Sequence, residues 1–145
     1  MTVSGSARAH GHRLEPHAAD VIVEAWGATV ASCLEQAVLG MVEAFADVGT
    51  AAPIQDVPVD LVADDRGELL VALLEEVIFL VEVGGRVPVA AHLEIDDTGH
   101  LVGGLGTVPA GAVDTTGALP KGVSRSGLVV EWVDDEWRAR AVVDV

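Results

Sequence analysis

Acidic residues near the two ends of the chain are the strongest candidates for chemistry. His17 and Asp20 stand three residues apart in the run HAAD, directly before a weakly alternating apolar segment at residues 21–26. Asp144 lies in a second alternating segment at residues 136–145. Alternation with a period of two is typical of strands, and we expect these two strands to pair in space. Asp20 and Asp144 would then form a carboxylate pair suited to acid–base chemistry. In the alternative, Asp20 caps a turn and the chain end is exposed.

The other nucleophiles and bases do not form a catalytic pattern. Cys33 is the only cysteine and falls in an apolar helical stripe, so we interpret it as a small core residue. His10 and His12 belong to a small, polar N-terminal segment and are expected in a solvated tail. His92 and His100 flank a predicted hairpin turn, where they could face each other, and we expect both at the surface. No Ser–His–Asp or Cys–His arrangement is readable, which disfavours nucleophilic catalysis.

The charge balance limits the possible partners. The chain carries a net charge of −15 and a single lysine, Lys121. Nucleic-acid binding requires clustered Lys and Arg to neutralise phosphates, so we expect no direct nucleic-acid binding and no binding to an anionic membrane. The acidic surface suits metal ions, a basic protein partner or simple solubility. Because the N-terminus has no apolar signal region, we expect a cytoplasmic protein.

Two helices are predicted from periodicity and from their caps. Thr29 is a plausible N-cap, and after it apolar residues recur at steps of three and one up to residue 45, which predicts an amphipathic helix. Asp65 should cap a second helix over residues 68–83, which Gly84 and Gly85 end. This second helix contains three glutamates, so it is not a membrane span. It is apolar nearly all round, and we expect it to be the more buried of the two.

Alternating segments predict the remaining strands. They cover residues 57–62, where Pro58 indicates an edge position, and residues 86–95, 100–107, 121–133 and 136–145. Glycines weaken the 100–107 segment, and their spacing does not match a phosphate-binding loop. The predicted class is therefore α+β, with two helices packed on one face of a mainly antiparallel sheet in a single domain. We expect residues 1–11 to form a flexible tail and residues 12–145 to form the domain.

Several stretches follow one another in a recognisable order. They are the HAAD run with the strand that ends in AWG, the helix that ends in FADV, the helix that ends in LVEVGG, the KGVS run from Lys121 and the closing strand WRARAVVDV. Over residues 13–145 their order and spacing resemble the archease family, whose opening strand carries a similar His-Thr-Ala-Asp motif.

The resemblance implies an accessory protein and not an enzyme. Members of the family activate the RNA ligase that joins ends bearing a 3′-phosphate or 2′,3′-cyclic phosphate to 5′-hydroxyl ends, in tRNA splicing and RNA repair. They promote guanylylation and multiple turnover of that ligase, so GTP would be a cofactor of the partner only. The expected role is chaperone-like, and the expected partner is an RNA ligase with a basic protein surface.

The resemblance also implies a divalent-ion site, which binds calcium in the family. Carried over by position, its ligands would be Asp20, Asp144 and, through its backbone or terminal carboxylate, Val145. These are hard oxygen donors, which suit Ca²⁺ or another hard divalent ion and do not suit zinc. His17 and Lys121 would contact the partner or a phosphate. For Lys121, a plain surface position is the alternative.

The chain departs from the family pattern at two places. Ala72 and Leu73 stand where the family carries Asp-Trp, and Arg125 and Ser126 stand where it carries Tyr-His. Three functions therefore remain open. They are activation of the RNA ligase, a degenerate metal-binding interaction module of the same fold with a different partner, and an enzyme that uses the Asp20–Asp144 carboxylate pair.

Overall fold

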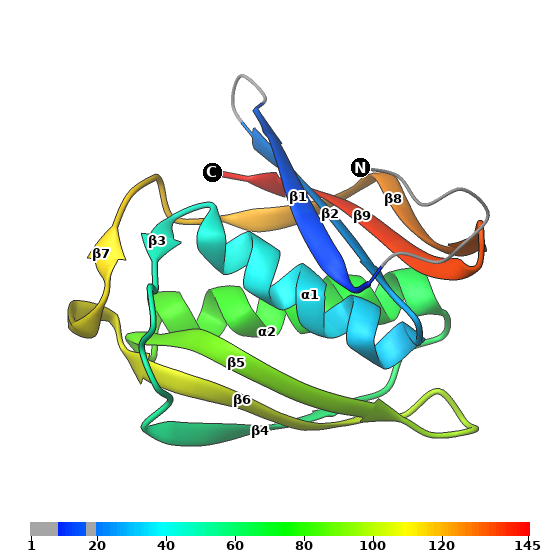
Figure 1. The fold of residues 1–145 in the computed structure, drawn as a ribbon, viewed down its shortest axis with the longest axis horizontal. Helices are drawn as coiled ribbons and strands as arrows, with labels where there is room; N and C mark the ends of the chain where they lie inside the picture. The colour runs from blue at the N-terminus through cyan, green and yellow to red at the C-terminus, as the bar shows by residue number, and fades with distance from the viewer. Residues whose placement is uncertain (1–8, 17–19) are drawn as a thin grey trace.

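Two helices lie between two antiparallel sheets in the computed structural model, which describes residues 9–16 and 20–145 (Figure 1). Within these residues the larger sheet has four strands. Across the sheet they are β1 (Gly11–Pro16), β2 (Asp20–Gly27), β9 (Glu136–Asp144) and β8 (Gly122–Val133). The predicted α+β class is confirmed, and the structure adds that the strands are divided between separate sheets.

The second sheet has three strands in the described part of the chain. In order they are β4 (Gln55–Leu61), β6 (Leu101–Pro109) and β5 (Arg86–Ile95). The predicted edge position of the Pro58 strand is confirmed, since β4 pairs with β6 on one side. A short pair, β3 (Ala46–Asp47) with β7 (Asp114–Thr115), and the 3₁₀ turn η1 (Ala110–Ala112) complete the elements.

The first helix, α1 (Val30–Glu43), begins at the predicted cap. The Thr29 hydroxyl accepts a hydrogen bond from the Ser32 N–H at 3.0 Å, and the Thr29 N–H donates to the Ser32 hydroxyl at 3.2 Å. These two bonds satisfy donors that a helix start leaves unpaired. α1 then packs against β2 of the four-stranded sheet and β5 of the three-stranded sheet, which places it between the two layers.

The second helix, α2 (Arg66–Glu82), also begins where its cap predicts. The Asp65 carboxylate accepts a hydrogen bond from the Glu68 N–H at 2.8 Å. Gly85 follows the helix with a φ of +63°, a left-handed conformation that glycine adopts without steric cost. α2 lies behind α1 in Figure 1 and packs against β8, β5, β4 and α1.

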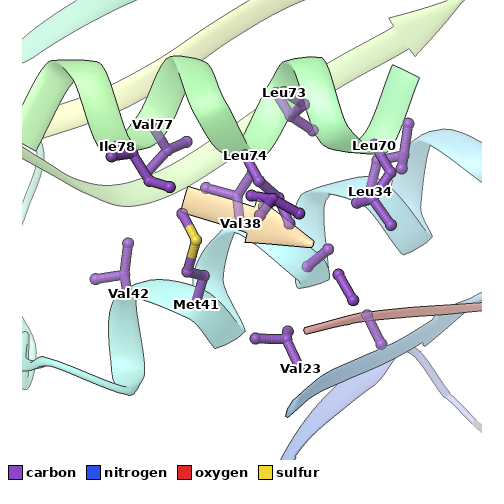
Figure 2. Packing of buried hydrophobic residues seen from close by; sticks show 14 of the residues in the cluster. Val23, Leu34, Val38, Met41, Val42, Leu70, Leu73, Leu74, Val77 and Ile78 are labelled. Atoms are coloured by element: carbon purple, nitrogen blue, oxygen red, sulfur yellow. The ribbon is translucent and has the colours of Figure 1, made fainter. Parts of the chain in front are cut away.

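The core is aliphatic and lies where the two helices meet each other and the sheets. Figure 2 shows Leu34, Val38 and Met41 of α1 facing Leu70 and Leu74 of α2. None of these five side chains is more than 1% exposed. Burying a side chain of this size is worth about 1.5–3 kcal/mol, so this helix–helix contact is a main source of stability.

The expectation that α2 is the more buried helix is wrong. In α1 only Glu43 is exposed, whereas α2 exposes Arg66, Glu75, Phe79 and Glu82. The reason is geometric. α1 has a sheet on either side, whereas no described element covers the outward side of α2, so its apolar residues on that side stay in contact with solvent.

The glycine-rich strand β6 is central in its sheet, which its composition alone does not suggest. A side chain at Gly103 would meet the His92 carbonyl oxygen at 2.1 Å, and one at Gly104 would meet the Asp56 carboxylate at 2.3 Å. Gly103 also has a φ of +145°. Gly103 is therefore required by the close approach of the β5 backbone, whereas the exposed Asp56 side chain beside Gly104 can move. The glycines of this central strand do not mark a weak edge.

The N-terminal expectation for His12 is corrected, because residues 11–16 form strand β1. The His12 side chain is only 22% exposed and packs on α1 beside Gly40, whose missing side chain leaves room for the ring. Its Nδ1 lies 2.9 Å from the Gln36 side-chain oxygen, and its Nε2 contacts the Glu43 carboxylate. His12 thus ties an edge strand to a helix and does not belong to a solvated tail.

The two hairpin histidines do not face each other. His92 pairs across the hairpin with Gly104, and its side chain is 67% exposed near the Asp56 carboxylate. His100 lies at the turn and is directed toward Asp60 of the neighbouring strand. The register of β5 and β6, which pairs Ile95 with Leu101, places the two rings at different positions along the sheet.

Candidate functional site

Strand pairing brings the two predicted acidic residues together. β2 and β9 run antiparallel with Asp20 directly opposite Asp144, and Val21 opposite Val143. Directly opposed residues have Cα atoms about 4.5–5.5 Å apart and their side chains on the same face of the sheet. Val143 is 1% exposed and points into the core. Because side chains alternate along a strand, Asp20 and Asp144 share the outer face, as the sequence predicts.

On the other side of β9, the residue of β8 that pairs with Asp144 is a glycine. Gly122 is opposite Asp144 on the other side of β9, and no atom lies within 4 Å of where a side chain at Gly122 would begin. The adjacent Lys121 donates its backbone N–H to the Asp144 carbonyl oxygen at 2.7 Å, and its side chain is exposed. The predicted set omits Gly122. The signal that could have indicated Gly122 is a glycine at the first position of β8, the strand that pairs with β9.

The residue that follows β9 lies beside apolar side chains. Val145 lines a small apolar space together with Val21, Met41 and Phe45. Phe45 and Met41 are 2% and 1% exposed, so this space belongs to the core. Val145 itself is half-buried and lies at the border of the core beside Val21. The structure thus brings together Asp20, Asp144, Val145 and Lys121, whereas His17 lies outside the described residues.

The donor set fits a hard cation. Ca²⁺ takes about 6–8 oxygen ligands, from carboxylates, carbonyls and water. Asp20 and Asp144 can supply two carboxylates on one face, since they lie directly opposite each other in neighbouring strands. No group of three or more His, Cys, Asp or Glu side chains within residues 9–16 and 20–145 could hold a metal. The described side chains at this end therefore supply two carboxylates, those of Asp20 and Asp144.

The positions at which the chain departs from the family pattern are not equivalent. Leu73 is 0% exposed and belongs to the core. Ala72 is half-buried on the outward side of α2. Arg125 of β8 forms a two-pronged ion pair with Glu68 of α2, with its Nε and Nη2 atoms 2.9 and 3.0 Å from the two carboxylate oxygens. That pair raises the pKa of Arg125 and ties the edge strand to the helix.

Cys33 is confirmed as a core residue. It is 0% exposed and its thiol lies 3.6 Å from the Ala25 carbonyl oxygen. Burial raises the pKa of the Cys33 thiol to about 12, and the nearby Glu136 carboxylate adds to the effect. A reactive cysteine needs the thiolate form, so Cys33 is not a nucleophile at neutral pH.

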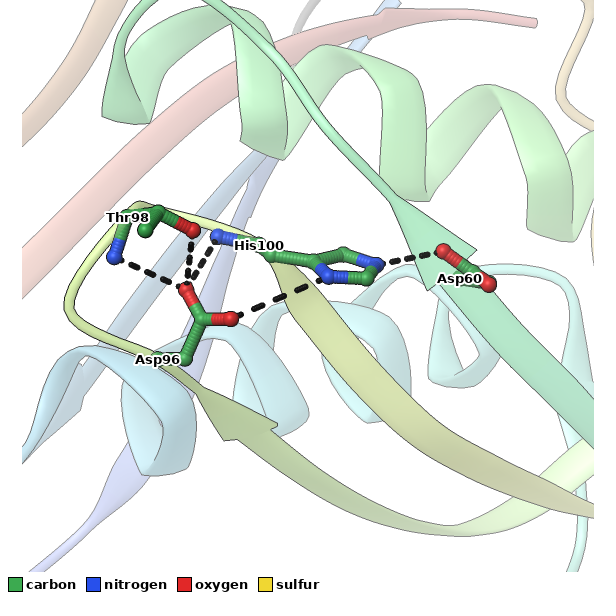
Figure 3. A network of polar contacts seen from close by, with 4 residues as sticks. All are labelled: Asp60, Asp96, Thr98 and His100. Atoms are coloured by element: carbon green, nitrogen blue, oxygen red, sulfur yellow. Dashed lines mark hydrogen bonds and ion pairs between the residues drawn. The ribbon is translucent and has the colours of Figure 1, made fainter.

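We call the opposed side chains of Asp20 and Asp144 the carboxylate row. A separate polar network ties β4 to the turn between β5 and β6 (Figure 3). His100 places its Nε2 atom 2.5 Å from Asp60 and its Nδ1 atom 3.8 Å from Asp96. The hydrogen bond to Asp60 is the main reason that the pKa of His100 is raised. The Asp96 carboxylate also accepts from the Thr98 hydroxyl, which lowers the pKa of Asp96. The network closes a turn, which accounts for its polar residues.

Neither α1 nor α2 combines the length and the apolar composition needed to cross a membrane, judged on the residues that the structure describes.

Comparison with known proteins identifies the family to which this fold belongs. The model of the Archease protein family (MTH1598/TM1083) matches residues 12–145. Proteins named "Probable protein archease" from two strains of Mycobacterium tuberculosis, CDC 1551 / Oshkosh and H37Rv, are each 41% identical over 135 residues. That alignment covers 93% of this chain and 75% of each relative. The chain belongs to the archease family.

Solved structures show the same fold. The solution structure of Methanobacterium thermoautotrophicum protein 1598 superposes with a TM-score of 0.78 at 23% identity, covering 93% of this chain and 99% of that one. The crystal structure of a Thermotoga maritima archease, described as a possible chaperone, superposes with a TM-score of 0.63 at 16% identity. It covers 94% of this chain and 100% of that one. The arrangement of two helices between antiparallel sheets is thus shared by these structures.

Proposed function

We propose that this protein is a cytoplasmic accessory factor that activates an RNA ligase. That ligase would join RNA ends bearing a 3′-phosphate or 2′,3′-cyclic phosphate to 5′-hydroxyl ends, in tRNA splicing and RNA repair. The protein itself would not be the enzyme, and GTP would enter only as the cofactor of the ligase. The observation that supports this proposal most is the register of β2 and β9, which pairs Asp20 with Asp144 on an outer face beside Lys121.

In this proposal the carboxylate row organises the contact with the ligase. Asp20, Asp144 and the backbone or terminal carboxylate of Val145 would hold Ca²⁺ or another hard divalent ion. When bound, the ion would neutralise the paired carboxylates and present positive charge at this end of the sheet. Lys121, exposed and next to Asp144 in space, would attract a phosphate group at the guanylylation site of the ligase.

The proposed role is chaperone-like in a limited sense. The description of the Thermotoga maritima relative as a possible chaperone accords with a protein that acts on the state of another protein. Here the affected state would be the ligase between turnovers, when it must be guanylylated again. The high negative charge, −15 in total, favours docking on a basic protein surface over direct contact with RNA.

The test is multiple-turnover ligation of a cyclic-phosphate RNA by the ligase of the same organism, with and without this protein. The wild-type protein should raise the turnover rate, and Asp20→Asn and Asp144→Asn should each remove most of that increase. Asp97→Asn is the matched control, because Asp97 is exposed in the turn between β5 and β6. Calcium titration by calorimetry should show weaker binding for the two row variants and unchanged binding for the control. An unchanged turnover rate with wild-type protein would contradict the proposal.

A degenerate interaction module with a different partner is the second candidate. The position of Ala72 on the outward side of α2, and the use of Arg125 to bind Glu68, favour it, since the surface there differs in chemistry from the family pattern. Under this alternative the protein would be folded and would bind calcium through Asp20 and Asp144, but would leave ligation unchanged. The same ligation and calorimetry experiment therefore separates the two candidates.

A further inference from the structure

The outward side of α2 carries two large apolar side chains that no described residue covers. Phe79 is 58% exposed and Val83, directly after the helix, is 68% exposed. The two are four residues apart, so they are neighbours on consecutive turns. At about 100° per residue, the half-buried Ala72 falls within about 20° of both, two turns before Phe79, with Glu75 on the turn between them. We call Ala72, Phe79 and Val83 the α2 seam. Single exposed apolar residues are ordinary on protein surfaces, but adjacent ones forming a stripe mark interaction sites.

Carboxylates border the α2 seam on both sides. Glu75 and Glu82 lie on one side of Phe79 around the helix axis and Glu76 lies on the other, each within about 60° at the helical spacing. Within the described part of the chain, no ion pair involves Glu76 or Glu82. Arg125 forms an ion pair with Glu68 at the beginning of the helix. Arg125 also interacts electrostatically with Glu75. The C-terminal half of the seam is therefore apolar along its centre and negatively charged at its borders.

We propose that the α2 seam docks a basic amphipathic segment of the ligase, as a contact additional to the carboxylate row. This inference rests on the proposed function for the identity of the partner. Phe79 would be the apolar anchor, since buried aromatic residues dominate binding energy at interfaces. Lysine or arginine side chains beside the partner's apolar residues would face Glu75, Glu76 and Glu82, which would speed association and orient the complex.

Charge also decides among other occupants of the seam. A second copy of this chain would place the same glutamates against one another, and like-charge contacts at an interface oppose association. An anionic lipid surface would be repelled for the same reason. From Ala72 to Val83 the seam spans 11 residues, or about 17 Å at 1.5 Å per residue. That length matches about three turns of a partner helix.

The test measures binding of the full-length ligase from the same organism by biolayer interferometry. The double variant Phe79→Ser/Val83→Ser should raise the Kd about 30-fold, the loss expected for an anchor of this type. Ile54→Ser/Val62→Ser is the matched control, because Ile54 and Val62 are 74% and 72% exposed but flank β4, away from α2. It should leave the Kd unchanged. Glu75→Gln/Glu82→Gln should slow association and reduce its dependence on salt.

Ligation assays run in parallel separate the possible failures. If wild-type protein stimulates ligation but Phe79→Ser/Val83→Ser binds the ligase with the wild-type Kd, the seam inference is overturned and the proposed function stands. If wild-type protein neither binds the ligase nor stimulates it, both are overturned. If Phe79→Ser/Val83→Ser instead abolishes a dimer seen by analytical ultracentrifugation and leaves ligase binding unchanged, the seam is an interface between copies, which also overturns the inference.

Discussion

The two helices are both rich in leucine and valine, yet they occupy different environments. α1 packs against β2 and β9 of one sheet and β5 of the other, and only Glu43 remains exposed. α2 packs on the same sheets and on α1 with one side, and exposes Phe79 on the other. The difference shows that an apolar composition makes burial favourable, but the number of covered sides depends on how many layers surround the helix.

This difference suggests a division of roles. α1 connects the layers and has almost no surface to offer a partner. α2 contributes Leu70 and Leu74 to the core and presents the seam outside (Figure 2). Substitutions should therefore affect stability similarly on the inward sides of the two helices and differently on their outward sides.

The largest effect is expected for leucines on the inward sides. Leu34→Ala in α1 and Leu74→Ala in α2 should each lower the free energy of unfolding by about 2–5 kcal/mol, because both side chains are 0% exposed and their removal leaves a cavity. Urea denaturation at neutral pH measures both. A loss below about 1 kcal/mol for Leu74→Ala alone would break the comparison, since the inward side of α2 would then contribute little.

Intermediate effects are expected at the caps. Thr29→Ala at α1 and Asp65→Ala at α2 should each cost about 1 kcal/mol, because each side chain satisfies an N–H at its helix start. Thermal denaturation followed by circular dichroism reports the change. Thr29→Ser, which keeps the hydroxyl, serves as the control and should stay close to wild type. Equal losses of stability for the two variants would show that the caps of the two helices are equivalent. The helices would then differ only in how many of their sides are buried.

A much smaller effect on stability is expected at the seam. Phe79→Ser should lower the free energy of unfolding by about 1 kcal/mol or less, because the Phe79 side chain is already 58% exposed and loses only partial burial when it is shortened. The same urea titration used for the leucines checks this value. A loss of 2 kcal/mol or more, on the scale of a core substitution, would mean that the α2 seam is covered in solution, contrary to its exposure here.

The smallest effect on stability is expected for the contact between His100 and Asp60 of β4, the strand that precedes α2. The raised pKa of His100 means that its link to Asp60 stabilises the folded state fully below the unfolded-state pKa of histidine, and that this contribution is lost as pH rises through the higher folded-state pKa. Wild type should thus exceed His100→Asn in stability by more near pH 5 than near pH 8. The lowered pKa of Asp96 places its own titration below this range. Thermal unfolding at several pH values measures the difference, and a constant difference would contradict it.

Much of the fold follows from local patterns. Thr29 and Asp65 cap the helices as predicted, and the β5–β6 and β8–β9 hairpins form where alternation and turn residues indicate. Strand β1 escaped prediction because Leu14 is the only large apolar residue among residues 11–16, so its strand conformation depends on pairing with β2. The two-residue strands β3 and β7 are too short to leave a periodic signal.

The candidate site was predictable in part. The acid before the first long strand and the acid in the last strand could be matched because both strands alternate, and the structure confirms their pairing. Three placements depend on residues distant in sequence: Gly122 opposite Asp144, Val145 beside Met41, and His12 on α1. No local pattern contains that information, because each contact joins segments that only the folded chain brings together.

The sequence by itself determined where the helices and most of the strands begin and end, which of their residues are apolar enough to enter a core, and that the surface is strongly acidic. Caps, periodicity and charge are properties of neighbouring residues. Only the tertiary structure decided that α1 is enclosed, that Phe79 of α2 stays exposed, and that Asp20 and Asp144 share a face. These depend on strand register and on the stacking of layers, which long-range packing selects.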